Sequence, residues 1–108
     1  MIKHIILWNL KDEYSDSQKL EIKKGIKQGL ESLQDKIPGL VDIHVNLESL
    51  DSSTCDVMLD STFETVDALK NYSVNPLHVE VADNFVRPYI KNRTAYDYED
   101  MKLYKDLY

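Results

Sequence analysis

The chain begins with residues that alternate with a period of two. In residues 2–10, one set is Ile2, His4, Ile6, Trp8 and Leu10, and the other is Lys3, Ile5, Leu7 and Asn9. This period predicts a β-strand, because successive side chains of a strand point to opposite faces. Large apolar groups occur in both sets, which is not typical of a sheet with one face in water. We therefore expect both faces of the sheet to be covered.

Residues 15–34 carry apolar side chains at helical spacing. At the start of this segment, Ser15 and Gln18 have the spacing of a capping box. Gly25 and Gly29 fall on the apolar stripe, where each costs about 1 kcal/mol of helix propensity relative to alanine. Their presence indicates either a close approach of the helix to the sheet or room for a ligand. The stripe itself consists of Ile22, Ile26, Leu30 and Leu33.

The rest of the chain divides into shorter elements. The turn at 37–39, Ile-Pro-Gly, leads to strands over 41–47 and 54–63, which a polar turn at 51–53 separates. A short helix follows Thr65, and helical structure restarts at Asn75-Pro76, because asparagine is a good cap and proline suits the first helical position. The restarted helix carries apolar residues at Leu77, Val81 and Phe85, and a final strand covers 92–99.

This order of elements, β-α-β-β-α-β, predicts an α+β domain of the ferredoxin-like type, with both helical segments on one side of a four-stranded antiparallel sheet. No further element is available to cover the other side. A second copy, packed sheet to sheet, would cover it and form a dimeric α/β barrel, and two-fold dimers are the commonest oligomers. We expect a homodimer of a domain over 1–99. The tail over 100–108 would form a short amphipathic helix on the partner or fray.

Composition narrows the classes of partner. The 108 residues carry a net charge of −6 and include no extended basic run, which argues against binding to nucleic acid or to an anionic membrane. The longest apolar run, residues 5–8, is too short to cross a membrane, and the first residues lack a signal-peptide pattern. We expect a cytoplasmic protein. The single Cys55 agrees with a reducing compartment and is interpreted as a small apolar filler in the third strand.

Three segments stand in a specific order and spacing. They are the opening residues 1–8, the turn at 37–40, and the stretch from Phe63 through Tyr72 to Asn75-Pro76-Leu77-His78-Val79. Together they resemble the stress-responsive α/β barrel (Dabb) family, over Met1 to about Glu99. The resemblance implies the same ferredoxin-like dimeric barrel, but it implies less about activity, because many members of the family have no assigned activity.

One plant enzyme of this family closes a linear polyketide by intramolecular aldol condensation without a metal or cofactor. The resemblance to it implies a catalytic tyrosine and histidine at Tyr72 and His78, a further histidine at His4, and an aromatic lining residue at Tyr89. The chain also departs from that enzyme. Asn75-Pro76-Leu77-His78 stands where the enzyme has His-Pro-x-His, and Ile22 and Ile26 stand where its first helix carries aromatic residues.

The residues around the Asn75-Pro76 turn are the best candidate site. An imidazole such as that of His78 can take a proton from the carbon next to a carbonyl, and a hydroxyl such as that of Tyr72 can hydrogen-bond the resulting enolate. The alternative is structural, with His78 bonded to a backbone carbonyl and Tyr72 closing the core. His4 and Trp8 share a strand face, and each is either a core residue or part of a ligand-binding lining that also includes Ile26 and Tyr89.

Other reactive side chains give weaker indications. The three histidines and one cysteine lack the spacing of a zinc site, so neither a metal nor a cofactor is expected. Asp97 and Glu99 share a strand face and are interpreted as a solvated edge. Haem-degrading barrels use a strand tryptophan and asparagine in a different arrangement, whereas Trp8 and Asn9 are adjacent here and point to opposite faces.

Two hypotheses follow for function. The first is a homodimeric barrel protein of undefined activity that binds a small apolar or aromatic molecule. The second is a cofactor-independent cyclase or isomerase acting on a carbonyl compound, with His78 as base and Tyr72 as donor. An open cavity that joins His4, Tyr72 and His78 would favour the enzyme, whereas side chains filling that space would argue against it.

Overall fold

The computed structural model describes residues 1–101. Its strands are β1 (Ile2–Leu10), β2 (Leu40–Asn46), β3 (Val57–Phe63) and β4 (Ile90–Glu99), and its helices are α1 (Asp16–Glu31), α2 (Val66–Val74) and α3 (Pro76–Val81). A π-helical turn, η1 (Ala82–Val86), and a 3-10 turn, η2 (Arg87–Tyr89), continue α3 into β4. The predicted order of elements is confirmed. The prediction for the tail falls on residues that, from 102 onward, lie outside the described part.

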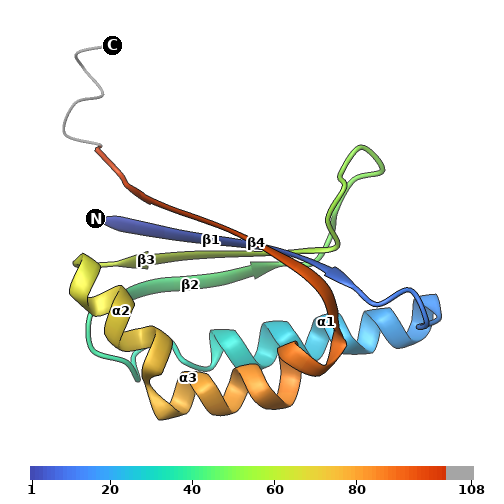
Figure 1. The fold of residues 1–108 in the computed structure, drawn as a ribbon, viewed down its shortest axis with the longest axis horizontal. Coiled ribbons are helices and arrows are strands. Elements are labelled where there is room, and N and C mark those ends of the chain that lie inside the picture. The colour runs from blue at the N-terminus through green and yellow to red at the C-terminus, as the bar shows by residue number, and fades with distance from the viewer. Residues whose placement is uncertain (102–108) are drawn as a thin grey trace.

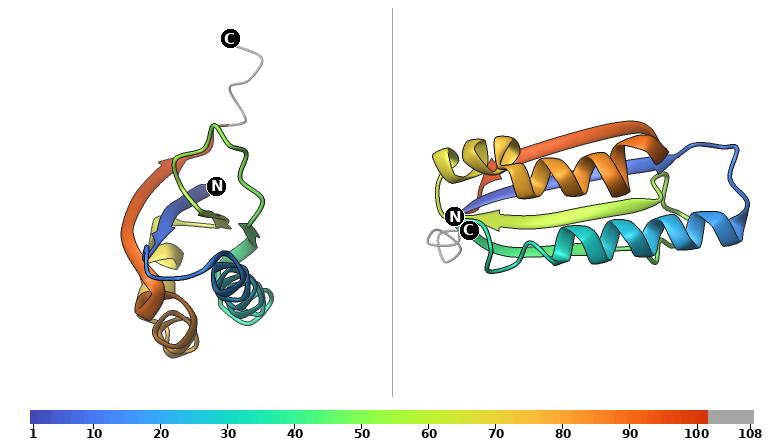
Figure 2. Two further views of the ribbon diagram at one scale, coloured as in Figure 1. Left: turned by 90° about the vertical axis from the view of Figure 1, so that its right-hand side faces the viewer. Right: turned by 90° about the horizontal axis from the view of Figure 1, so that it is seen from below.

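The four strands form one antiparallel sheet in the order β2-β3-β1-β4. This is the ferredoxin-like arrangement predicted from the sequence. All helices lie on one side of the sheet, and the β2–β3 connection rises on the other side (Figure 1). Seen from below, α1 runs beside α2 and α3 across the same face (Figure 2). The opposite face of the sheet is therefore left open.

The core lies between the helices and the sheet. Alternate residues of β1 and β3 are buried there, as the period of two predicts, and the inward set is His4, Ile6, Trp8, Leu10, Val57, Leu59, Ser61 and Phe63. Ile26 and Leu30 of α1 pack against them. Ile5, Leu7 and Met58 point to the open face and are half-buried.

The start of α1 is as predicted. The Ser15 hydroxyl accepts a hydrogen bond from the Gln18 amide, and the Gln18 side chain accepts one from the Ser15 amide, at 3.2 and 2.8 Å. The helix ends at Glu31, before the predicted limit, because the chain then enters turns in which Asp35 takes a positive φ of 67°. No described helix is long and apolar enough to span a membrane.

The helical segment after Asn75 differs from the prediction in its phase. Leu77 and Phe85 are 45% and 43% exposed, whereas Ala82 and Val86, each one residue after a member of the predicted stripe, are buried. Val81 and Phe85 instead contact α1. A Cβ added to Gly29 would lie 3.0 Å from each of these two side chains. The glycines of α1 therefore permit a close approach to the neighbouring helical segment rather than to the sheet.

The third strand also begins later than predicted. β3 starts at Val57, and Cys55 lies half-buried in the preceding connection rather than in a strand. The Asp56 carboxylate accepts a hydrogen bond from the Leu10 amide, and the Asp56 amide donates to the Trp8 carbonyl, at 2.8 and 2.9 Å. These contacts occupy the place of ladder hydrogen bonds, so pairing with β1 ends there.

Candidate functional site

A cavity of about 300 Å³ lies between the sheet and the α2–η2 segment. It brings together four of the predicted site residues, His4, Trp8, Tyr72 and His78. The remaining lining residues are Ile6, Leu30, Leu59, Ser73, Ala82, Val86, Arg87, Ile90 and Arg93. The cavity thus joins His4, Tyr72 and His78. An open space between these three residues is the feature expected of the enzyme rather than of a purely structural role.

The other two predicted lining residues lie elsewhere. Ile26 is fully buried in the core and is not among the residues that line the cavity. Tyr89 packs against Tyr14, with ring centroids 6.1 Å apart, beside a separate hollow along α1. The aromatic position at Tyr89 is therefore turned away from the cavity.

The break between α2 and α3 places Tyr72 beside His78. Asn75 caps α3 through its side chain, which accepts a hydrogen bond from the Leu77 amide at 2.9 Å, and Pro76 is the first helical residue. This fixed turn brings the rings of Tyr72 and His78 to a centroid distance of 4.1 Å. The His4 ring, from β1, lies 6.2 Å from the Tyr72 ring.

Tyr72 offers an unused hydrogen-bond donor. Its side chain is 1% exposed, and its hydroxyl is buried without a partner among residues 1–101. Burial raises the pKa of Tyr72 strongly, and the charge of Arg93 only partly opposes this. The hydroxyl therefore stays protonated at neutral pH. A buried polar group costs stability unless a ligand or a water completes its hydrogen bonding.

His78 is poised as a neutral imidazole. Burial lowers its pKa, the backbone of Ser73 opposes that shift, and the nearby charges of Arg87, His4 and Arg93 add to it. Its Nδ1 is buried and makes no hydrogen bond of good geometry within the described residues. A neutral ring with a free nitrogen lone pair can accept a proton.

His4 is held by a residue that the sequence interpretation missed. His4 Nδ1 is hydrogen-bonded to Asp97 Oδ1, because the two residues stand opposite each other in the β1–β4 register. Asp97 does lie on a solvated outer strand, with its side chain 48% exposed, but the interpretation did not include its contact with His4. The alternation of Asp97 with Tyr96 and Tyr98 indicates that its side chain points to the opposite face of β4 from the two tyrosines. The sequence does not give the register with β1, and that register is what places Asp97 beside His4.

The described residues contain no group of three or more histidine, cysteine, aspartate or glutamate side chains that is suited to a metal ion. The chemistry that the lining can supply is a hydrogen-bond donor at Tyr72, a base at His78 and an oriented imidazole at His4. Such a set suits proton transfer on a polar ligand with an apolar body.

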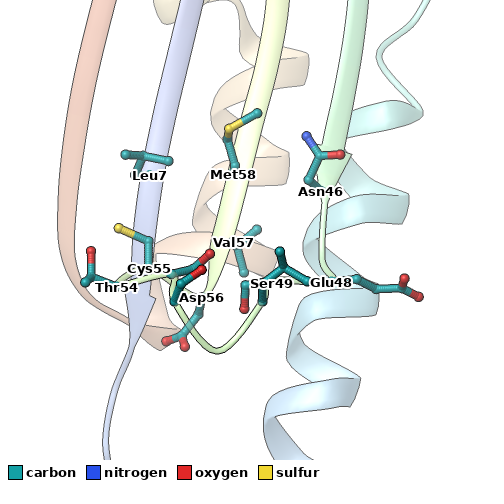
Figure 3. A pocket seen from close by; sticks show the side chains of 12 residues that line it. Leu7, Asn46, Glu48, Ser49, Thr54, Cys55, Asp56, Val57 and Met58 are labelled. Carbon is teal, nitrogen blue, oxygen red and sulfur yellow. The ribbon is translucent and has the colours of Figure 1, made fainter.

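A second hollow, of about 450 Å³, lies on the open side of the sheet, where the β2–β3 connection rises (Figure 3). Leu7 and Met58 of the sheet and Cys55 of the connection line it, together with polar residues of the connection. No histidine or arginine lines this hollow. It continues the open face and lacks the acid–base set of the first cavity.

Comparison with known proteins finds relatives that match almost the whole chain. Olivetolic acid cyclase from Cannabis sativa is 27% identical over 105 residues, which cover 94% of this chain and 98% of the cyclase. A dimeric protein of unknown function with a ferredoxin-like fold from Bacteroides fragilis is 30% identical, with a TM-score of 0.85, covering 92% of this chain and 95% of that one.

A third relative shares the fold at lower identity. Hydroxynitrile lyase from Passiflora edulis is 17% identical, with a TM-score of 0.69 and 94% of each chain covered. Residues 2–100 match the family described as the stress responsive A/B barrel domain. The fold and this match over nearly the whole chain lead to one conclusion: the chain belongs to the stress-responsive A/B barrel family.

Proposed function

We propose that each subunit binds a small carbonyl compound in the cavity and catalyses proton transfer at the carbon next to the carbonyl. The observation that carries this proposal is the cavity that the Tyr72 hydroxyl, buried without a partner within residues 1–101, shares with the His78 imidazole, whose Nδ1 is also unpaired there. Side chains filling the space between His4, Tyr72 and His78 would argue against the proposal. A cavity lined by all three residues supports it.

The proposed step uses the two side chains in fixed roles. His78, neutral because burial lowers its pKa, takes the proton from the carbon and becomes an imidazolium. The electron pair left on carbon moves onto the carbonyl oxygen, and the Tyr72 hydroxyl donates a hydrogen bond to the enolate formed. The proton then returns at another position, which gives isomerisation. Alternatively, the enolate carbon attacks a second carbonyl of the same molecule, the C=O π pair of that carbonyl moves onto its oxygen, and the oxygen takes the proton from the His78 imidazolium, which gives ring closure. Asp97 acts as a positioning residue for His4.

The relatives support ring closure as one form of this chemistry. The similarity to olivetolic acid cyclase extends over 94% of the chain and includes the segment that carries Tyr72 and His78. Asn75 departs from the enzyme pattern implied by the family resemblance. Its side chain is already engaged as the cap of α3, so the departure leaves the positions of Tyr72 and His78 intact.

The open face of the sheet supports the homodimeric part of the proposal. The related Bacteroides fragilis protein is described as dimeric. Ile5, Leu7, Met58, Tyr96 and Tyr98 would be covered by a second copy packed sheet to sheet, which would form the dimeric α/β barrel. A cytoplasmic location stays a prediction.

A second function also has specific support. Apolar side chains make up much of the cavity lining, and such a lining suits passive binding of an apolar or aromatic molecule. They are Ile6, Trp8, Leu30, Leu59, Ala82, Val86 and Ile90. Binding and proton transfer share the cavity and differ only in whether His78 acts as a base.

Hydrogen–deuterium exchange at the central carbon of benzoylacetone, followed by NMR in deuterium oxide, tests the proton transfer. Benzoylacetone is neutral, aromatic and enolisable. We expect the wild-type protein to accelerate exchange, and Tyr72→Phe and His78→Asn each to reduce the acceleration by about a hundredfold or more. The acceleration should fall as the pH drops through the lowered pKa of His78, because protonation removes the base.

Tyr14→Phe is the matched control. This substitution also removes a tyrosine hydroxyl, but Tyr14 contacts Tyr89 outside the cavity, so the rate of hydrogen–deuterium exchange in benzoylacetone should be unchanged. If benzoylacetone raises the melting temperature of the wild-type protein without faster exchange, passive binding is the correct function. Full exchange activity in both cavity variants would refute the assigned roles.

A further inference from the structure

The cavity has a positively charged side that takes no part in the proton transfer described above. Arg87 and Arg93 line this side, and no aspartate or glutamate is among the residues that line the cavity. The whole chain, in contrast, carries a net charge of −6. A cationic lining in an acidic protein concentrates anions at that place.

Of the two arginines, only Arg93 is free to bind a ligand. Arg87 is paired with Asp83 at 2.5 Å. Within residues 1–101, Arg93 makes no hydrogen bond or ion pair. Asp97, which follows on the same strand and the same face, is engaged by His4. A guanidinium left without an anion next to a cavity is typical of a site whose anion arrives with the ligand.

Arg93 also stands within electrostatic reach of the buried polar groups. It lies opposite Trp8 in the β1–β4 register, so it belongs to the helix-covered side of the sheet, and its exposure places it at the rim. Its charge acts on the pKa of both Tyr72 and His78. A ligand held at the rim by Arg93 can therefore extend inward to the unpartnered Tyr72 hydroxyl, which is 1% exposed.

We infer that the cavity takes a small organic carboxylate, whose anionic group binds Arg93 and whose apolar or aromatic body lies along Trp8 and Leu59. The single free guanidinium matches the planar fork and single charge of a carboxylate, whereas a dianionic phosphate would leave a charge unpaired. The volume of about 300 Å³ is at the small end of ligand sites. This inference rests on the ligand site of the proposed function but not on its proton transfer.

Benzoate and benzamide are suitable probes, because they share a shape and differ in charge. Their binding is measured by NMR chemical-shift titration of the isotopically labelled full-length protein. We expect the wild-type protein to bind benzoate about tenfold more tightly than benzamide, as a charge-assisted hydrogen bond implies. Arg93→Gln should abolish this preference while benzamide binding is kept, which also shows that the variant is folded.

Lys91→Gln is the matched control. It removes the same charge from the same strand, but Lys91 pairs with Asp12 and does not line the cavity, so the preference for benzoate should remain. Equal affinity for the two probes, or no binding of either, would overturn the inference, and so would tighter binding of phenyl phosphate than of benzoate. Because the exchange assay uses neutral benzoylacetone, failure here is distinguishable from failure of the proposed function.

Discussion

Gly39 turns the chain into β2 with a positive φ of 80°. This conformation costs a non-glycine residue about 1–2 kcal/mol. A Cβ at this position would also lie 2.4 Å from the Cβ of Ala68, on α2. The close contact joins the loop before β2 to the helix that carries Tyr72.

We therefore expect Gly39→Ala to lower the free energy of unfolding by about 2–4 kcal/mol, because strain and overlap add. Urea denaturation measures the loss. Measured against an Ala68→Gly protein, Gly39→Ala should cost only the part that is due to φ, because the overlap is absent there and the helix cost of the added glycine cancels. Gly25→Ala is the contrasting control. Its Cβ would meet Phe85 at 3.5 Å, an ordinary contact, so we expect a gain of about 0.5–1 kcal/mol. If Gly39→Ala left the free energy of unfolding unchanged, strain and overlap at this position would be refuted.

The residues of the site differ in how far the sequence predicts them. Tyr72 and His78 are set by a local feature, the Asn75-Pro76 restart, so their proximity follows from short-range spacing. Asp97 and Arg93 reach the site because β4 pairs with β1. These two strands lie far apart in the sequence, near the start and the end of the domain. No local pattern reports that register, so the partner of His4 was missed.

At the scale of elements, side chains of α1 and the turn after it complete the free edge of β2. β2 is an outer strand, and its outward backbone groups have no strand partner. The Glu31 carboxylate accepts a hydrogen bond from the Val45 amide at 2.9 Å, and Lys27 donates to the Val45 carbonyl at 2.8 Å. Gln34 accepts from the Ile43 amide at 3.1 Å. These contacts cover an edge that would otherwise be open to another strand.

Glu31→Ala should lower the free energy of unfolding by about 2 kcal/mol, because it leaves the buried Val45 amide without its acceptor and removes one of the two acceptors of Lys27. Burial alone would raise the pKa of Glu31, but the bonds from Lys27 and Val45 outweigh this and hold it below its usual value. The stabilisation is thus present above the usual pKa and is lost as the pH falls through the lowered one.

Thermal melts over a series of pH values measure this effect, and the difference between wild-type and Glu31→Ala proteins should shrink in acid. Glu21→Ala is the matched control on the same helix. Its side chain is 75% exposed and lies 3.6 Å from Lys24, so we expect little change. Equal losses in the two variants would show that the edge contacts do not stabilise β2.

Element types and order were predictable from periodicity, whereas their ends and rotation were not. The end of α1 and the start of β3 depend on the turn at Asp35 and on the bonds of Asp56, which compete with regular structure. The rotation of the segment after Asn75 depends on its contact with Gly29, which turns Phe85 toward α1. Apolar spacing alone predicted as buried a face that is displaced by one residue, about 100° around the helix.

At the scale of the whole molecule, the open side of the sheet exposes several large apolar side chains. Tyr96 and Tyr98 of β4 are 68% and 40% exposed there, and their rings lie 5.7 Å apart. Together with the half-buried Ile5 and Leu7 they form an apolar strip, which the β2–β3 connection borders (Figure 1). A strip of this kind is typical of a surface that another protein covers.

If a second copy covers this strip, sedimentation at micromolar concentration should give twice the subunit mass of 12.6 kDa. Leu7→Glu should then give a monomer, because it would bury a charge between the two sheets without a partner. Leu20→Glu introduces the same charge at a 48% exposed position on α1, away from the strip, and should remain dimeric. A wild-type monomer, or a Leu7→Glu dimer as tight as the wild type, would refute the face-to-face barrel. The cavity lies on the helical side of the sheet, so a folded Leu7→Glu monomer should still bind ligand there.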